Sequence, residues 1–264
     1  MAKRKKEFDK YWYYRRAVQS PENDVEFFRD TYKSIRGKLP TTLREDFCGT
    51  FSLCCEWVKL GPRYRAYGID LDEEPIQYGK THYLPQLSNS QRERVEILQD
   101  NVLSPGLPSA DVICAMNFSH FIFKERAQMK AYFRNCYSTL NKDGILITDA
   151  FGGALCQKAN VEKTKHRGFT YYWDQESFDP VTNYAQFHIH FKVDGEKKRE
   201  KVFSYDWRMW SLPELRELML EAGFRKATVY WEGSTPSGKG NGIFTPVEKG
   251  EECEAWIAYV IGEK

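Results

Sequence analysis

The 264-residue chain is predicted to fold as a doubly wound α/β protein with a seven-stranded, mostly parallel sheet and helices on both faces. Short β-rich segments alternate with helical segments between residues 42 and 149, which is typical of a parallel sheet. Two early strands end in acidic residues, at Glu45-Asp46 and at Asp70. After residue 153 the alternation stops, which predicts an antiparallel β insert behind the fifth strand.

The first forty residues are expected to form a helical segment ahead of the sheet. Apolar residues recur at three- and four-residue steps across residues 8–36, and Ser20-Pro21 interrupts them. Asp24 is expected to be the N-cap of the second helix. The stretch 37–40 contains Gly and Pro and should end it.

The alternating part of the chain follows from Thr42. Strands are expected at 42–46, 65–70, 95–98, 111–116 and 145–149, and helices at 51–60, 74–83 and 124–140. In such sheets the ligand crevice lies at the carboxyl ends of the strands. The loops after these strands are therefore the place to look for functional residues.

Behind Gly152-Gly153 the pattern indicates strands rather than helices. Strands are expected at 169–173, 184–193 and 200–205, with a hairpin turn at Asp194-Gly195. A helix at 212–222 has Ser211 as its cap and Gly223 at its end. Strands at 227–232 and 255–261 complete the sheet, and the glycine-rich loop 233–250 between them is expected to be mobile.

Composition narrows the possible classes of function. The net charge is +2, from 39 basic and 37 acidic residues, too balanced to indicate a nucleic-acid partner. The basic cluster Lys3 to Lys6 is interpreted as a solvated tail. No apolar run approaches the roughly 20 residues of a membrane span, and no secretory signal precedes the fold. Seven cysteines without ligand-pair spacing favour reduced thiols over a zinc site. A cytoplasmic protein is expected.

The loop after the first strand indicates the kind of cofactor. It contains Gly49, but Phe47 and Phe51 stand where a dinucleotide fingerprint has glycines. Asp70, which closes the second strand, is placed to accept hydrogen bonds from both hydroxyls of a ribose. A bulky loop suits a cofactor with a ribose and an adenine but no pyrophosphate. This favours S-adenosylmethionine (SAM) over NAD.

The order of these motifs resembles the class I SAM-dependent methyltransferases. The matching segments are 45–50, 68–72, 99–102, 111–117, 140–151 and 215–224, and the resemblance runs from about Thr41 to the end. It implies a Rossmann-like fold with SAM as cofactor. Residues 41–264 would then be the methyltransferase domain, 154–208 a β-rich substrate lid within it, and 1–40 a cover over the cofactor site. The sequence Leu-Arg-Glu-Asp-Phe-Cys-Gly-Thr at 43–50 suggests a divergent branch.

The resemblance also implies a set of cofactor-binding residues. Gly49 would let the backbone approach the methionine part of SAM, and Asp100 would face the adenine amine. Glu45 either contacts the cofactor or forms an ion pair with Arg44. The rings of Phe47 and Phe51 either pack the loop against the N-terminal helices or narrow the cofactor pocket. The full set is Tyr14, Glu45, Cys48, Gly49, Asp70, Leu71, Asp100, Asn101, Val102 and Asn117.

Fewer residues indicate the methyl acceptor. Asn117 fits the motif of amino-directed nucleic-acid methyltransferases, but the two prolines of that motif are missing, which disfavours a flipped base. His120 is the candidate general base, with a structural histidine as the alternative. Trp173 and Trp207 could flank a cationic amine, and Arg208 could bind a carboxylate or phosphate. His188 and His190 have no evident third ligand, so no metal is expected.

The sequence thus predicts in-line transfer of the methyl of SAM to a nucleophilic N or O of a small-molecule acceptor. Two alternatives stay open at this stage. One is an RNA or protein methyltransferase anchored by the basic tail. The other is a catalytically silent SAM-binding or scaffold protein, suggested by the loss of loop glycines.

Overall fold

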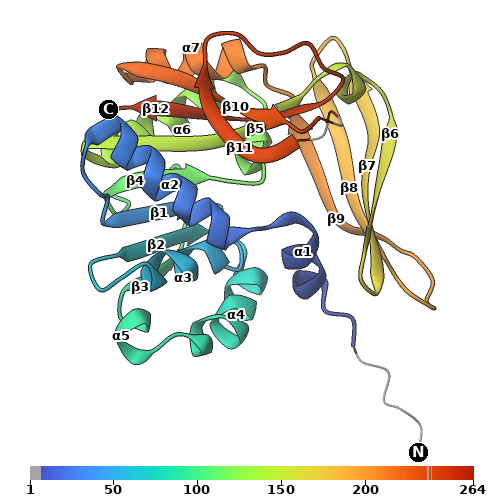
Figure 1. Cartoon of the computed structure of the whole chain (residues 1–264), viewed down its shortest axis with the longest axis horizontal. Coiled ribbons are helices and arrows are strands. Elements are labelled where there is room, and N and C mark those ends of the chain that lie inside the picture. The colour runs from blue at the N-terminus through green and yellow to red at the C-terminus, as the bar shows by residue number, and fades with distance from the viewer. Residues whose placement is uncertain (1–6, 237, 239) are drawn as a thin grey trace, which may run out of the picture.

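The computed structural model describes residues 7–236, 238 and 240–264 (Figure 1). The basic cluster at Lys3–Lys6 lies outside these residues. The helices are α1 (Lys10–Val18), α2 (Pro21–Arg36), α3 (Ser52–Lys59), α4 (Glu73–His82), α5 (Asn89–Arg92), α6 (Arg126–Thr139) and α7 (Leu212–Ala222). The strands are β1 (Thr42–Asp46), β2 (Arg65–Asp70), β3 (Val95–Gln99), β4 (Ala110–Ala115), β5 (Leu140–Gly152), β6 (Asn160–His166), β7 (Phe169–Asp179), β8 (Tyr184–Val193), β9 (Arg199–Arg208), β10 (Lys226–Ser234), β11 (Gly240–Val247) and β12 (Trp256–Glu263).

The central sheet has the predicted doubly wound architecture. Its order, over the described residues, is β11-β10-β12-β5-β4-β1-β2-β3. Strands β1 to β5 pair in parallel, and β12 lies antiparallel between β5 and β10. The predicted mostly parallel α/β fold is confirmed, with one strand more than the seven expected.

The additional strand is β11, in the segment expected to be a mobile loop. It pairs antiparallel with β10. The expectation was wrong because the glycines of this segment serve close packing. A Cβ at Gly240 would lie 2.3 Å from Oε1 of Glu232, and the N–H of Gly242 donates to that oxygen at 2.9 Å.

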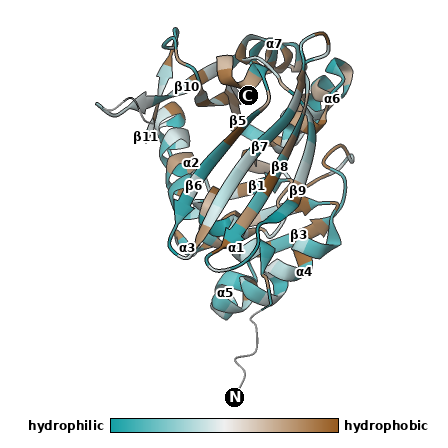
Figure 2. Ribbon diagram, turned by 90° about the vertical axis from the view of Figure 1, so that its right-hand side faces the viewer, coloured by the Kyte–Doolittle hydropathy of each residue, from teal (hydrophilic) through white to brown (hydrophobic). Residues whose placement is uncertain are grey.

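The insert is a second, antiparallel sheet with the order β6-β7-β8-β9. Strands β7, β8 and β9 correspond to the predicted ones, and the hairpin turn at Asp194-Gly195 is present. Strand β6 was missed because it is an exposed edge strand with the sequence Asn-Val-Glu-Lys-Thr-Lys-His, which carries little apolar pattern. In Figure 2 the insert lies across the face turned toward the viewer, and β6 is mostly hydrophilic.

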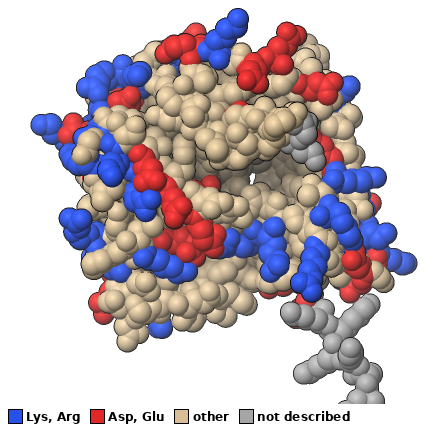
Figure 3. Space-filling view, viewed as in Figure 1, with Lys and Arg blue, Asp and Glu red and all other residues tan. Residues whose placement is uncertain are grey.

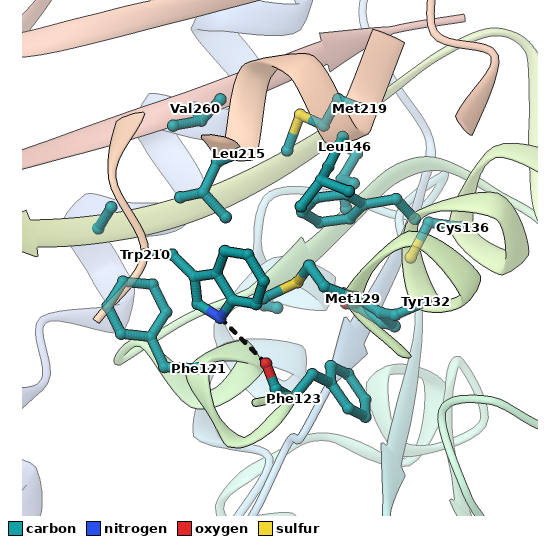
Figure 4. Close-up of a cluster of buried hydrophobic side chains, with 14 of the residues drawn as sticks. Phe121, Phe123, Met129, Tyr132, Cys136, Leu146, Trp210, Leu215, Met219 and Val260 are labelled. Carbon is teal, nitrogen blue, oxygen red and sulfur yellow. Dashed lines mark hydrogen bonds between the residues drawn. The ribbon is translucent and has the colours of Figure 1, made fainter. Parts of the chain in front are cut away.

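Two apolar layers cover the two faces of the central sheet. On one face α2 and α3 pack over Leu43, Cys114 and Ile147. On the other, α6 and α7 cover Ile113 and Leu146. Figure 4 shows this second layer, in which the indole N–H of Trp210 donates to the carbonyl of Phe123 at 3.0 Å. The predicted cap of α7 is confirmed, since the hydroxyl of Ser211 accepts from the N–H of Glu214.

The N-terminal helices connect the central sheet to the insert. Helix α1 packs on the apolar face of the insert around Phe169, Ile189 and Phe191. Its other end is tied to α4, where Tyr78 donates to Asp9 at 2.8 Å and Lys10 pairs with Glu74 at 2.7 Å. Helix α1 therefore spans the gap between α4 and the insert (Figure 1).

Helix α2 begins earlier than predicted. Its N-cap is Ser20 and its first residue is Pro21, so Asp24 stands within the first turn and is not the cap. The physical reason is that proline is favoured at the first helical position, where its missing N–H costs nothing. The shift matters, because it turns the Asp24 side chain toward a cavity described below.

Candidate functional site

The carboxyl ends of β1, β2 and β3 meet at Asp70. Oδ2 of Asp70 accepts from the backbone N–H of Gly49 at 2.6 Å, and Oδ1 accepts from that of Asp72 at 2.9 Å. The N–H of Asp100 donates to the carbonyl of Asp70 at 3.0 Å. Burial raises the pKa of Asp70 against these hydrogen bonds. The structure thus gathers residues that come from three separate loops.

The loop at Gly49 is open on the side where a ligand would lie. Gly49 has φ of +51°, and a Cβ built there meets no heavy atom within 4 Å. Leu71, directly after Asp70, leaves 63% of its surface exposed. Backbone and apolar surface are both accessible here, as a nucleoside with an amino-acid tail requires.

Of the two phenylalanines of this loop, Phe51 is a core residue and Phe47 is partly buried and packs against the core. Both have left-handed backbones, with φ of 59° at Phe47 and 47° at Phe51. Phe51 is fully buried, and its ring takes the space in which Gly79 of α4 would otherwise carry a Cβ. The ring of Phe47 lies 5.8 Å from that of Tyr132 on α6. The glycines are therefore replaced by side chains that pack against α4 and α6.

The loop after β3 forms a small turn of its own. Oδ1 of Asp100 accepts from the N–H of Asn101 at 2.7 Å and from the hydroxyl of Ser104 at 2.6 Å. These bonds lower the pKa of Asp100. Oδ1 of Asn101 accepts from the N–H of Leu103, and the Val102 side chain is buried. Within the described chain, Oδ2 of Asp100 has no partner.

Strand β1 sends successive acidic side chains to opposite faces of the sheet. Arg44 and Asp46 point to the α6 side and form a fully buried ion pair at 2.8 Å. Glu45 points to the α3 side, where it accepts from the N–H of Cys54 at 3.3 Å and from its thiol. Burial raises the pKa of Glu45 to about 8. The alternative ion pair between Glu45 and Arg44 was wrong, because the two-residue period of a strand separates them.

A cavity of about 560 Å³ lies beside these strand ends, between β4, β5, the insert and the N-terminal helices. Figure 3 shows the hollow near the middle of the face. Aromatic rings form much of the wall, and four carboxylates line it: Asp24, Asp149, Glu162 and Glu232. Within the described residues, no Lys, Arg or His contributes to the lining.

Asp149 joins the cavity to the end of β4. Its carboxylate accepts from the N–H of Asn117 at 2.7 Å and from that of Phe118 at 2.8 Å. Both donors have left-handed backbones, with φ of 56° and 59°. Asp149 is 6% exposed, and burial raises its pKa to about 7. One carboxylate therefore holds the strained turn that carries Asn117 to the cavity wall.

Three of the predicted residues line the cavity as aromatic rings. Tyr14 comes from α1, and burial raises the pKa of its phenol to about 12. Trp173 comes from β7 and Trp207 from β9, with Tyr205 stacked on Trp207 at 4.4 Å. The structure thus brings together rings from the N-terminal segment and from the insert.

Known proteins with a similar sequence or fold are methyltransferases. Residues 48–146 match a family described as a methyltransferase domain, while no curated protein matches the chain. Among solved structures, a SAM-dependent methyltransferase from Clostridium acetobutylicum is 17% identical with a TM-score of 0.65, over 95% of this chain and 96% of that one. The fold is that of a SAM-dependent methyltransferase. The fold that the sequence resemblance implied is confirmed, and the match at residues 48–146 supports a methyltransferase domain in that part of the chain.

Two further structures have this methyltransferase fold. The amino pentose methyltransferase CalS10 from Micromonospora echinaspora is 14% identical with a TM-score of 0.64, over 97% of this chain and 99% of its own. The sugar N-methyltransferase KedS8 from Streptoalloteichus is 15% identical with a TM-score of 0.64, over 100% and 96%. No described helix of this chain is both long and apolar enough to cross a bilayer. The cytoplasmic location stays a prediction.

Two residues predicted for the acceptor side, His120 and Arg208, lie away from the cavity. His120 sits in a 3₁₀ turn (Ser119–Ile122), fully buried, with both ring nitrogens unpartnered, and burial lowers its pKa to about 3. Arg208 donates to the carbonyl of Lys124 and to Glu214, both at 3.0 Å. Neither side chain is among those that line the cavity. Their proposed roles stay predictions that the geometry does not favour.

Two carboxylates of the cavity were missed as functional residues. The sequence predicts Asp24 as a helix cap and Asp149 only as the last residue of a strand. A signal for Asp149 did exist, because an acidic residue that closes a parallel strand points into the ligand crevice. No local signal distinguished Asp24, since its position depends on how α2 docks.

Proposed function

We propose that this methyltransferase transfers the methyl group of SAM to a nitrogen atom of a small-molecule amine bound in the cavity. The observation that carries the proposal is the lining, which combines four carboxylates with aromatic rings and has no basic side chain within the described residues. Such a surface favours a cation, since aromatic faces and carboxylates both attract positive charge. The neighbours named for an amino pentose and for sugar N-methylation support this choice.

The cofactor would lie across the ends of β1, β2 and β3. Asp70 is proposed to bind the ribose hydroxyls with the lone pairs that Gly49 and Asp72 leave free. Open backbone at Gly49 and the exposed Leu71 leave room for the methionine and adenine parts. Asp100, with a free oxygen, is the proposed partner of the adenine amine. These features fit SAM.

The N-terminal segment and the insert are proposed to close the site. Helix α1 carries Tyr14 to the cavity wall, and residues 154–208 supply Trp173 and Trp207. Bound SAM supplies a methyl group that is already activated as part of a sulfonium. The protein's contribution is then to align the acceptor nitrogen in line with that methyl and to exclude water.

The alternative of a catalytically silent SAM-binding or scaffold protein was suggested by the missing loop glycines, and the packing of the loop removes that argument. Phe47 and Phe51 pack against α6 and α4, and Gly49 stays open. The RNA or protein alternative depended on the basic tail, which lies outside the described residues. The cavity supports a small acceptor in preference to either alternative.

The experiment is a methyl-transfer assay with isotopically labelled SAM and a panel of matched small amines, alcohols and phenols, read by mass spectrometry. We expect N-methyl products from the amines alone. Transfer only to oxygen would show that the acceptor atom is wrong. Absence of any binding of SAM by calorimetry would refute the proposed function altogether.

A further inference from the structure

Asp24 is a carboxylate without a protein partner. It stands in the first turn of α2 and lines the cavity, and within the described residues its side chain makes no hydrogen bond or ion pair. Arg15, whose charge acts to lower the pKa of Asp24, is paired with Glu22 at 2.7 Å. A largely buried, uncompensated charge destabilises a fold. Its presence in a cavity wall therefore points to a cation that arrives from outside.

Asp149 is the second anion of this part of the cavity. The two carboxylates raise each other's energy when both are ionised, as the effect of Asp24 on the pKa of Asp149 shows. Asp149 is fixed by the N–H groups of Asn117 and Phe118, whereas Asp24 is free of such bonds. Because its oxygens are held by two N–H groups, Asp149 can position a ligand. Asp24 has no such bonds, so it can both bind a ligand and accept a proton from it.

Gln175 points independently to a ligand that donates hydrogen bonds. This side chain lines the cavity and is only 4% exposed. Its Nε2 donates to the carbonyl of Cys156 at 2.7 Å, and its Oε1 has no partner within the described chain. The amide thus presents only its acceptor to the cavity. An amine or ammonium group supplies the donors that Asp24 and the Oε1 of Gln175 lack, and it can bind beside the Asp149 carboxylate.

We propose that Asp24 and Asp149 hold the acceptor amine as an ammonium ion and that Asp24 removes one of its protons before methyl transfer. This inference rests on the proposed function. The proton moves from R–NH₃⁺ to the carboxylate of Asp24, which leaves R–NH₂ and a carboxylic acid. The nitrogen lone pair then forms the N–C bond as the C–S bond breaks and sulfur keeps the electron pair. The products are the N-methylammonium ion and S-adenosylhomocysteine (SAH), and Asp24 later returns its proton to water.

The ionisation of the pair suits this role. Burial raises the pKa of both Asp24 and Asp149 to about 7, so each loses its proton near neutral pH. Titratable and charged groups face Asp24 from every element around it: Arg15, Glu22, Glu45, Cys114, Asp149 and Tyr259. Arg15 is the one cation among these groups, and it forms an ion pair with Glu22. The raised pKa of Asp24 makes its carboxylate a better proton acceptor than an exposed aspartate.

The test uses two cofactor analogues and needs no knowledge of the acceptor. Sinefungin carries an ammonium-bearing carbon where SAM carries its methylsulfonium, and SAH carries an uncharged sulfur without the methyl group there. The ratio of their dissociation constants therefore measures how strongly the protein attracts a positive charge at the position of the transferred methyl group. Calorimetry would measure both constants at pH 6 and pH 8 for the wild type, for Asp24→Asn and for Glu26→Gln. The last variant removes an exposed carboxylate from the same helix and serves as the matched control.

At pH 8 we expect Asp24→Asn to reduce the preference for sinefungin over SAH by about tenfold, the scale of one hydrogen bond to a charge. Glu26→Gln should leave the preference unchanged. The wild-type preference should fall at pH 6, where the pair is protonated, while that of Asp24→Asn should change less. An unchanged ratio in Asp24→Asn would overturn the inference. Loss of SAH binding by the wild type would instead overturn the proposed function. As a control for folding, the melting temperature of Asp24→Asn is measured without ligand. We expect it to be at or above that of the wild type.

Discussion

Replacing Phe51 by glycine tests how a loop without its glycines keeps a cofactor crevice open. Phe51 is fully buried against α4, and its left-handed backbone has φ of 47°. The Phe51→Gly variant removes the ring and relaxes the backbone at once. The two effects act on the free energy of unfolding with opposite signs, so their sizes decide the outcome.

Loss of a buried phenylalanine side chain typically costs about 3–5 kcal/mol. Relief of a left-handed, non-glycine backbone returns roughly 1 kcal/mol. The free energy of unfolding should therefore fall by about 2–4 kcal/mol. For a chain of this size that corresponds to a melting temperature about 5–15 °C lower.

Urea unfolding measures the stability, and calorimetry with SAH measures the crevice. Leu220→Ala is the control, because Leu220 is 47% exposed and should change stability by less than about 0.5 kcal/mol. We expect Phe51→Gly to bind SAH with wild-type affinity, at a temperature where it is folded. Wild-type stability would show that the ring is not a core residue. A large change in SAH affinity with normal folding would show that the ring shapes the cofactor pocket.

Four further predictions follow from the same geometry. Asp70→Ala should weaken SAM binding by about 1.5–3 kcal/mol in calorimetry, and unchanged affinity would contradict the ribose assignment. Arg44→Met should cost about 3–5 kcal/mol in urea unfolding by leaving Asp46 buried and unpaired, whereas replacing both residues by apolar ones should restore most of it. His120→Leu should be at least as stable as the wild type, because both ring nitrogens lack partners, and loss of turnover with normal SAM affinity would support His120 as a base. The free energy of unfolding should decrease as the pH rises from about 4 to 7, because burial raises the pKa of Asp24 in the folded state to about 7, so that the folded state keeps a proton that the unfolded state has released. An equally steep decrease in Asp24→Asn would contradict this.

Much of the fold could be predicted because it depends on local patterns. The alternation of strands and helices from Thr42 to Asp149 and the cap at Ser211 are features of neighbouring residues, and both are confirmed. The errors concern segments with weak local patterns. Strand β6 is a polar edge strand, and β11 is interrupted by glycines that pack against Glu232.

The proposed cofactor side of the site could also be predicted from the sequence, because strand ends in a parallel sheet meet at one edge. Asp70, Gly49 and Asp100 could therefore be named before their contacts were known. The acceptor side depends on contacts between distant segments. Asp24 faces the cavity only because α2 docks over the sheet, and His120 is turned away from it.

By itself, the sequence determined the class of fold and predicted the cofactor and the strand ends proposed to face it, since these follow from periodicity and from the order of motifs. Only the tertiary structure decided what the cavity contains. It buried Phe51 in the core, packed Phe47 against the core and paired Arg44 with Asp46. It also left Asp24 and Asp149 in one cavity whose lining, among the described residues, has no basic side chain. The physical reason is that burial and charge pairing are set by packing between elements far apart in the chain, which no local pattern records.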